Sequence, residues 1–371
     1  MSKLYQVALS FIPQIGNVLT KQLISYCGSA EQVFKTNRGK LLKIPNIGEK
    51  IASLIAEHQA EALKKAEAAL KQAEKERAKI LFYTDTDYPQ RLRQFADSPA
   101  LLYWQGNADL DAPVMVGIVG TRKATKYGKA VTEQIVAQLQ ALKATIISGL
   151  AYGIDILAHR EALKNALPTI GVMGSSLDRI YPYEHAATAR QIIANGGLLT
   201  EYTFGVSPAA PHFPNRNRII AALSDAIIVV EAAAKGGALI TAEYANQYNR
   251  EVFAVPGNLG QTYSEGCNYL IQQHKAHIFT SVEAMAALMN WHKDAQQKVR
   301  KATCQLQQPT ILNLPKEESE IYSLLKQHGE MHLDDLGWQS GLGVSQAAVA
   351  LLSLEFQGLV KSLPGKKFAL C

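Results

Sequence analysis

The chain has 371 residues, more than the roughly 100–200 usual for one domain, so two or three domains are expected. Hydrophobic residues make up 47% and charged residues 19%, which is ordinary for a globular protein with a sizeable core. The 38 Lys and Arg against 32 Asp and Glu give a net charge of +6. As a total this charge is too small to indicate a nucleic-acid partner, so the placement of the charges must decide.

The four cysteines, Cys27, Cys267, Cys304 and Cys371, are far apart and form no CxxC pair. This spacing argues against a zinc ribbon, a redox motif and a disulfide scaffold, and it favours a reducing compartment. No apolar run approaches the roughly 18 residues of a membrane span, and residues 1–17 make a poor signal peptide. We therefore expect a cytoplasmic protein without a membrane span.

An internal repeat opens the chain. Residues 12–16 and 44–48 both read I-P-x-I-G, and each is followed by a helical run. The pattern resembles the helix-hairpin-helix, whose glycine turn directs free N–H groups at a phosphate without reading sequence. Alternatively, the motif only turns a small helical domain, and the residues leave both readings open. Residues 57–79 alternate acids and bases and predict a solvated linker helix, which would close a first domain over 1–80.

From about residue 113 to residue 289, short β-branched runs alternate with amphipathic helical runs. The expected strands are VMVGIVG, TIISGL, PTIGVMG, LLTEY, AIIVVEA, EVFAVPG and HIFT. Nearly continuous hydrophobic strands separated by helices are typical of a parallel sheet covered on both faces. The sequence thus predicts an α/β, doubly wound, Rossmann-like domain with a mostly parallel sheet, which we place with its lead-in segment at 81–290.

Residues 291–316 are rich in Gln and Lys, carry two prolines and are expected to be a linker. Residues 317–371 show three helical runs and then a hairpin, the order of a winged helix. Its expected recognition helix, 344–358, has no Lys or Arg, whereas Lys361, Lys366 and Lys367 lie in the wing. Major-groove readers need donors and positive charge, which argues against a sequence-specific transcription factor. The tail is expected to be a protein-contact or accessory module.

In a doubly wound sheet, ligands bind beyond the carboxyl ends of the strands. The first loop there begins at Gly120 and lacks both the full G-x-G-x-x-G fingerprint and the P-loop spacing, which disfavours NAD and ATP. What remains is a glycine turn into a helix start with Arg122 beside it, a site for phosphate. The alternative, a glycine needed only to leave the strand, explains the bases Lys123, Lys126 and Lys129 less well.

The second informative loop covers residues 208–220 and is stiffened by three prolines. Two residues with ring side chains are followed there by four residues with amide or guanidinium hydrogen-bond donors: His212, Phe213, Asn215, Arg216, Asn217 and Arg218. An aromatic ring beside arginines is typical of single-strand binding, with the base on the ring and the phosphate on the guanidinium. Arg216 and Arg218 are two apart on a helix and point to roughly opposite sides. We expect one to meet phosphate and the other to pin the loop, and the sequence leaves open which.

A third loop, Lys235-Gly236-Gly237, precedes a helix and is either an anion cradle or a capping turn.

The placement of charged residues supports the assignment of the first two loops as binding loops. Residues 112–132 contain four bases and no acid, and no acid occurs between Glu201 and Asp225. Two acid-free stretches at one edge of a sheet predict a local positive groove.

A catalytic set is harder to find, because HExxH, G-x-S-x-G and a cysteine beside a histidine are all missing from the sequence. His159 has apolar neighbours at helical spacing and is expected to be structural. Asp155 is expected to cap the same helix. Glu243 is the acid best placed to face the pocket. We assign no catalytic residue, metal or cofactor.

These segments resemble the DprA/Smf family, the DNA-processing proteins of natural transformation. GIVGTRKATKYG, ISGLAYGIDILAHREAL, GSSLDRIYP, FPNRNRIIAALSD, GGALITAEYA and VFAVPGN follow one another as they do in that family, over about half of the chain. The flanks look like its N-terminal helical domain, of the SAM or helix-hairpin-helix kind, and its C-terminal winged helix. The resemblance implies a non-enzymatic protein that binds incoming single-stranded DNA and protects it from nucleases. It also implies loading of a RecA-type recombinase past single-strand-binding protein, and homodimers formed through the Rossmann-like domain.

Taken together with the loops above, the resemblance gives a set of expected DNA-binding residues. They are Gly120, Thr121, Arg122, Lys126, Ser175, Phe213, Asn215, Arg216, Asn217, Arg218, Lys235, Gly236 and Gly237. The sequence departs from the family in two places: Gly237-Ala238 replaces the more usual serine pair of K-S-G-S, and Pro211-His212 stands where some relatives carry a lysine.

The alternative function is a nucleotide phosphoribohydrolase, an enzyme class on the same Rossmann variant. Its P-G-G-x-G-T-x-x-E motif is echoed from Gly236 to Glu243. However, Lys235 replaces the proline, one glycine is lost, and Glu243 falls two residues after Thr241. The broken register argues against hydrolysis.

Overall fold

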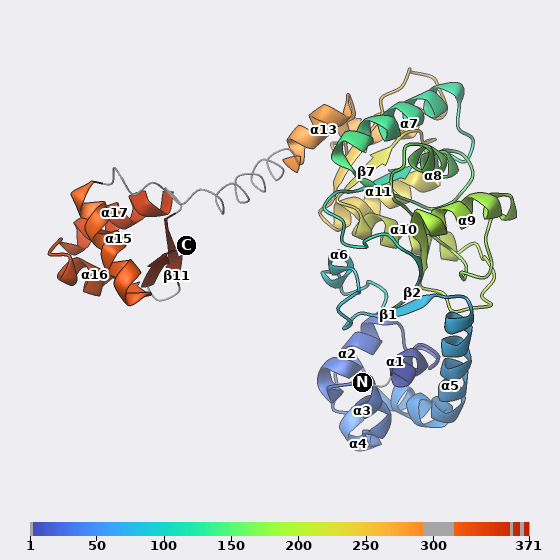
Figure 1. Ribbon diagram of the computed structural model, residues 1–371. Coiled ribbons are helices and arrows are strands. Elements are labelled where there is room, and N and C mark those ends of the chain that lie inside the picture. The colour runs from blue at the N-terminus through green and yellow to red at the C-terminus, as the bar shows by residue number, and fades with distance from the viewer. Residues whose placement is uncertain (1–2, 292–314, 357–358, 364–366, 371) are drawn as a thin grey trace. The chain divides into compact units, whose positions relative to one another are not determined.

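The computed structural model describes residues 3–291, 315–356, 359–363 and 367–370. It divides into two compact units, Met1–His292 and Lys293–Cys371 (Figure 1). The first unit contains both the helical segment and the sheet, so the boundary expected at residue 80 falls inside it. The expected linker 291–316 lies almost wholly outside the described residues, as do Cys304 and Cys371. Within the described ranges, no helix is both long and apolar enough to cross a membrane.

A nine-stranded sheet organises the first unit, in the order β1-β2-β6-β5-β4-β3-β7-β8-β9. Strands β3 to β9 pair in parallel, and β1 and β2 join the β6 edge in antiparallel register. The strands are β1 (Lys79–Phe82), β2 (Leu101–Gly106), β3 (Met115–Val119), β4 (Thr145–Ser148), β5 (Thr169–Val172), β6 (Gly196–Thr200), β7 (Ala226–Val229), β8 (Glu251–Ala254) and β9 (His277–Ile278).

Helices cover both faces of the sheet, which confirms the predicted doubly wound fold. One buried cluster joins the sheet to α7 (Lys126–Leu139), α8 (Ile154–Lys164) and α13 (Val282–Leu288). Another joins it to α10 (His212–Leu223), α11 (Gly237–Gln247) and α12 (Glu265–Gln272). The seven predicted strands are β3 to β9. Strands β1 and β2 were not predicted, because they lie in the lead-in segment, and only the fold brings that segment to β6.

The N-terminal segment forms α1 (Lys3–Leu9), α2 (Asn17–Cys27), α3 (Ala30–Lys35), α4 (Arg38–Leu41) and α5 (Glu49–Lys75). The glycines of the two I-P-x-I-G motifs, Gly16 and Gly48, are the N-caps of α2 and α5. The solvated linker helix expected over 57–79 is wrong in one respect. It is the second half of α5, and its alanines at spacings of four and three (Ala62, Ala66, Ala69, Ala73) are buried. They share a hydrophobic cluster with β1, β2 and α9 (Ala186–Ala194).

The second unit confirms the predicted winged helix. Helices α15 (Lys316–His328), α16 (Leu333–Gln339) and α17 (Val344–Phe356) pack on a small antiparallel sheet of order β10-β12-β11. Its strands are β10 (Met331–His332), β11 (Val360–Leu363) and β12 (Lys367–Leu370). Lys361 and Lys367 lie on the wing strands as expected, and Lys366 lies outside the described residues. In the first unit, the short α6 (Gln90–Arg93) completes the fold.

Candidate functional site

A cleft of about 800 Å³ opens where the strand order reverses, because β3 pairs with β4 on one side and with β7 on the other. This is the place where doubly wound sheets bind ligands. The loops after β3 and β7 line it together with the first turns of α10 and α11. Among the predicted residues, the cleft brings together Gly120, Thr121, Arg122, Phe213, Arg216, Asn217, Gly236 and Gly237.

Arg122 is an exposed cation at this cleft. Its guanidinium carbon lies 5.7 Å from the centre of the Phe213 ring, within cation–π range. None of the described residues places a carboxylate within 4 Å of Arg122, so its charge is free for a ligand. The Phe213 ring is also 5.6 Å from the Tyr181 ring. A side chain at Gly174 would overlap the Phe213 ring, so that glycine lets the ring lie against the backbone.

A buried carboxylate holds the loop that carries Arg122. Glu231 follows β7 and accepts hydrogen bonds from the Thr125 amide at 3.0 Å and the Thr125 hydroxyl at 2.5 Å. Its own carbonyl accepts the Thr121 N–H at 2.7 Å, so that expected phosphate donor is already used. A side chain at Gly128 would overlap the carboxylate of Glu231. Lys126, the first residue of α7, is exposed and lines a neighbouring cavity instead of the main cleft.

Arg216 forms part of the cleft floor and is only 4% exposed. Its Nη1 donates to the carbonyls of Gly149 and Val172, and its Nε donates to the Asn217 side chain at 3.1 Å. The Gly149 amide donates to the Asp155 carboxylate at 3.2 Å. Burial raises the pKa of Asp155, and the nearby Arg216 charge opposes that shift. Arg216 therefore ties the ends of β4 and β5 to α10.

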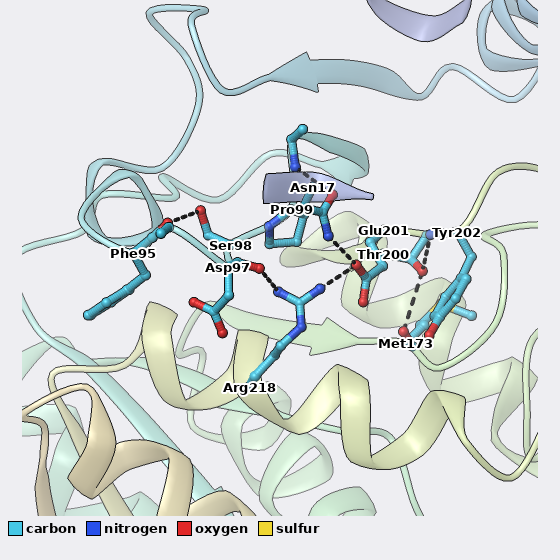
Figure 2. Close-up of polar contacts among 12 residues, drawn as sticks. Asn17, Phe95, Asp97, Ser98, Pro99, Met173, Thr200, Glu201, Tyr202 and Arg218 are labelled. Carbon is cyan, nitrogen blue, oxygen red and sulfur yellow. Dashed lines mark hydrogen bonds and ion pairs between the residues drawn. The ribbon is translucent and has the colours of Figure 1, made fainter. Parts of the chain in front are cut away.

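Arg218 does not line the cleft. Its guanidinium contacts Asp97 and Glu201 instead, as Figure 2 shows. Its Nη1 donates to the Asp97 carbonyl at 2.7 Å, and its Nη2 is 2.5 Å from Oε2 of Glu201. The Asn17 amide donates to the same oxygen at 3.5 Å. Burial raises the pKa of Glu201, and Arg218 opposes that shift. Each arginine of the pair thus has protein partners, on opposite sides of α10.

The same cluster docks the first I-P-x-I-G hairpin against the sheet. The side-chain oxygen Oδ1 of Asn17 accepts a hydrogen bond from the Ala100 backbone N–H at 2.9 Å. On the next turn of α2, the Lys21 ammonium donates to the Phe95 carbonyl at 3.0 Å and to the Ser98 hydroxyl at 2.7 Å. Burial lowers the pKa of Lys21 to about 8. These contacts favour the reading in which this motif positions a helical domain.

Three other predicted residues lie away from the main cleft. Asn215 is exposed and lines the cavity beside Arg218. Lys235 is exposed just before the lining glycines of α11. Ser175 is buried, and its hydroxyl donates to the Arg179 carbonyl at 2.7 Å within its own loop.

The acids are arranged differently from the expectation. Glu243 does not line the cleft; it is exposed and pairs with Lys275 at 3.0 Å, so its assignment to the pocket is wrong. Asp155 lines the cleft instead, and it does not cap α8, whose N-cap is Gly153. His159 is structural as expected: it is fully buried, its Nδ1 is 2.7 Å from the Thr169 hydroxyl, and burial lowers its pKa to about 3. Among the described residues, no group of three or more His, Cys, Asp or Glu is arranged to hold a metal ion.

Comparison with known families matches two parts of the chain. The family model for DNA recombination-mediator protein A matches residues 79–290, and the DprA winged-helix model matches residues 305–366. Protein Smf of Synechocystis sp. is 33% identical over 390 residues, which cover 98% of each chain. DNA processing protein DprA of Streptococcus pneumoniae is 40% identical over 202 residues, 54% of this chain and 71% of that protein.

Two solved structures are similar to part of this chain. The X-ray structure of DprA from Streptococcus pneumoniae superposes with a TM-score of 0.66 at 32% identity, covering 77% of this chain and 98% of that one. DprA from Helicobacter pylori, described for its single-stranded DNA binding mode, superposes with a TM-score of 0.52 at 32% identity, covering 57% and 95%.

Proposed function

The chain belongs to the DprA/Smf family of DNA-processing proteins, and on that premise we propose that it binds single-stranded DNA in the cleft beyond β3 and β7. The observation that carries the proposal is the free charge of Arg122, held beside the Phe213 ring at that cleft. A cation for phosphate next to a ring for a base is how single strands are bound without sequence preference. The single-stranded DNA binding of the Helicobacter pylori relative agrees with it.

Each part of the cleft has a distinct task in this proposal. Arg122 neutralises a phosphate, and Phe213 stacks a base. At the start of α11 the Gly236 N–H already donates to the Ala233 carbonyl at 2.9 Å, so the Gly237 N–H supplies the further donor to phosphate. Arg216 adds positive potential from below the surface while it shapes the floor. Exposed Lys235 extends the positive potential beyond the glycines.

We further propose that the bound DNA is protected from nucleases and handed to a RecA-type recombinase in the presence of single-strand-binding protein. The family model's description as a recombination mediator supports this role. One cleft is short compared with a long strand, so two protomers side by side are needed, and we propose a homodimer. Recombinase ATP hydrolysis on DNA coated with single-strand-binding protein should rise when the protein is added. No stimulation would contradict the mediator role.

The proposed function is binding without covalent chemistry. In the alternative phosphoribohydrolase, Glu243 would have to face the nucleotide, yet it pairs with Lys275 outside the cleft. Incubation with nucleoside monophosphates should release no free base. Base release that tracks the protein through purification would contradict this proposal.

The direct test is a fluorescence titration of an oligothymidine and a duplex of the same length, at two salt concentrations. The proposal predicts tighter binding of the single strand and a steep loss of affinity at higher salt, because phosphate contacts release counterions. Equal affinity for both forms, or no measurable binding, would contradict it.

A further inference from the structure

Three tyrosines are exposed along one edge of the cleft. Tyr152 is 41% exposed, Tyr181 46% and Tyr183 82%. They come from the loop after β4 and the loop after β5. Exposed rings that gather in one place are typical of interaction surfaces, because each leaves apolar area in water. The binding residues discussed above include none of the three.

This edge is continuous with the cleft. Tyr181 lines the cleft, with its ring 5.6 Å from that of Phe213. Ala151 also lines it, directly before Tyr152 in the chain. Tyr183 follows Tyr181 by two residues. A strand that leaves Phe213 on this side would therefore meet Tyr181 first.

The two loops that carry the tyrosines are bonded to each other. Buried His185 places its Nδ1 2.7 Å from the Leu150 carbonyl, and the Tyr152 ring packs edge-on against His185 at 5.0 Å. The tight turn at Leu150 (φ 58°) and Gly153 (φ 77°) presents Tyr152 outward. A side chain at Gly153 would overlap the backbone of the Arg122 loop. The rings of Tyr152 and Tyr181 thus have contacts that hold them relative to the cleft before any ligand arrives, which lowers the entropic cost of binding.

We propose that Tyr152, Tyr181 and Tyr183 form a base-stacking track that continues the single-stranded DNA path out of the cleft; this inference rests on the proposed function. The charge on the track favours bases over phosphates. The Tyr152 hydroxyl donates to the Glu184 carboxylate at 2.9 Å, and this negative charge repels phosphate. Rings accept any base, so the track adds affinity without sequence preference.

The test begins with Tyr152→Ala, Tyr181→Ala and Tyr183→Ala, each compared with its Phe counterpart. Loss of a stacking ring should weaken binding of a long oligothymidine roughly 5- to 100-fold, whereas Phe should retain wild-type affinity because the ring is what stacks. The matched control is Tyr26→Ala on α2, a tyrosine 60% exposed in the helical segment, which should leave affinity unchanged.

Length and base content sharpen the test. An oligothymidine of about four nucleotides fills the cleft alone, so Tyr183→Ala should bind it like the wild type, whereas a strand of about sixteen should reveal the loss. An abasic strand of the longer length should bind wild type and Tyr183→Ala equally, because no base remains to stack. With 2-aminopurine placed along the strand, wild type should quench the positions that lie on the track, and the Ala variants should not.

Equal affinity of all three Ala variants and wild type for the long strand would overturn the track, as would equal losses on abasic DNA. Arg122→Ala separates this failure from failure of the proposed function. If Arg122→Ala weakens binding while the tyrosine variants do not, the result supports DNA binding in the cleft and contradicts the stacking track. If wild type itself binds no single-stranded DNA, the proposed function fails first.

Discussion

Two basic segments meet at the cleft and use their charges differently. The loop from Gly120 to Lys126 exposes Arg122, Lys123 and Lys126, and no carboxylate of the described chain lies within 4 Å of them. In the first turns of α10, by contrast, Arg216 donates to buried carbonyls and Arg218 pairs with Glu201. Two segments of similar composition at the same sheet edge therefore differ: one leaves its cations unpaired at the cleft, and the other engages its arginines within the protein.

The second acid-free stretch shows why composition alone misleads. It runs between Glu201 and Asp225, and both bounding acids are themselves paired. Glu201 lies 2.5 Å from Arg218, and Asp225 lies 2.8 Å from Arg91 of α6. Glu201 therefore neutralises a cation of this stretch, whereas Asp225 pairs with an arginine outside it. The cations of the Arg122 stretch, by contrast, have no carboxylate within 4 Å among the residues that the structure describes.

The largest effect should come from breaking the ion pair between Arg218 of α10 and Glu201, which follows β6. Glu201→Leu leaves Arg218, whose side chain is 12% exposed, without its carboxylate. The free energy of unfolding should fall by about 3–5 kcal/mol in urea titrations. The double variant Glu201→Leu/Arg218→Met should recover most of that loss, since it removes both charges. A single variant with wild-type stability would show that the pair is not structural.

A substitution in the cleft floor at Gly149 should lower the stability of the protein nearly as much. In Gly149→Ala the new methyl group would overlap the Arg216 guanidinium, and overpacking of this kind costs about 1–3 kcal/mol. The matched control is Gly237→Ala, where a methyl group meets nothing within 4 Å. Thermal unfolding of both variants checks this. Equal melting temperatures of Gly149→Ala and Gly237→Ala would contradict close packing of Arg216 against Gly149.

Buried His159 predicts that the stability of the fold depends on pH. Burial disfavours the charged form of His159 and lowers its pKa in the folded chain to about 3 from the ordinary histidine value of 6.5. Its contribution is therefore fully present above pH 6.5 and is lost as the pH falls towards 3. Between pH 7 and pH 5 the wild type should lose about 2 kcal/mol more stability than His159→Gln. Parallel pH profiles in urea unfolding would refute a neutral buried imidazole.

The smallest effect is expected from substitution of Lys129, which belongs to the same acid-free stretch as Arg122 but does not line the cleft. Lys129 is exposed on α7 and lines none of the three cavities discussed above. Lys129→Ala should change both stability and DNA affinity by less than about 0.5 kcal/mol. A loss as large as that of Arg122→Ala would mean that general positive charge, and not the cleft, holds the DNA.

Local sequence patterns predicted most strands of the sheet and one residue of the candidate site. The features that they did not predict depend on contacts between residues far apart in the sequence. The β-branched runs predicted β3 to β9, and the glycine turn predicted Arg122 at the binding edge. The alanine face of α5, the role of Glu231 and the two partners of Arg218 could not be predicted in the same way. Thr125 and Glu231 are 106 residues apart, so only the fold reveals their bond. The exposed Tyr181 had a signal in its own loop, the segment GSSLDRIYP.

The most direct test of the central claim is the salt dependence of single-stranded DNA affinity for Arg122→Ala and for Glu201→Leu/Arg218→Met. If Arg122 meets a phosphate and Arg218 holds the structure, Arg122→Ala should reduce the slope of log affinity against log salt by about 0.7, and the double variant should keep the wild-type slope. A wild-type slope in Arg122→Ala together with a reduced slope in the double variant would contradict the account.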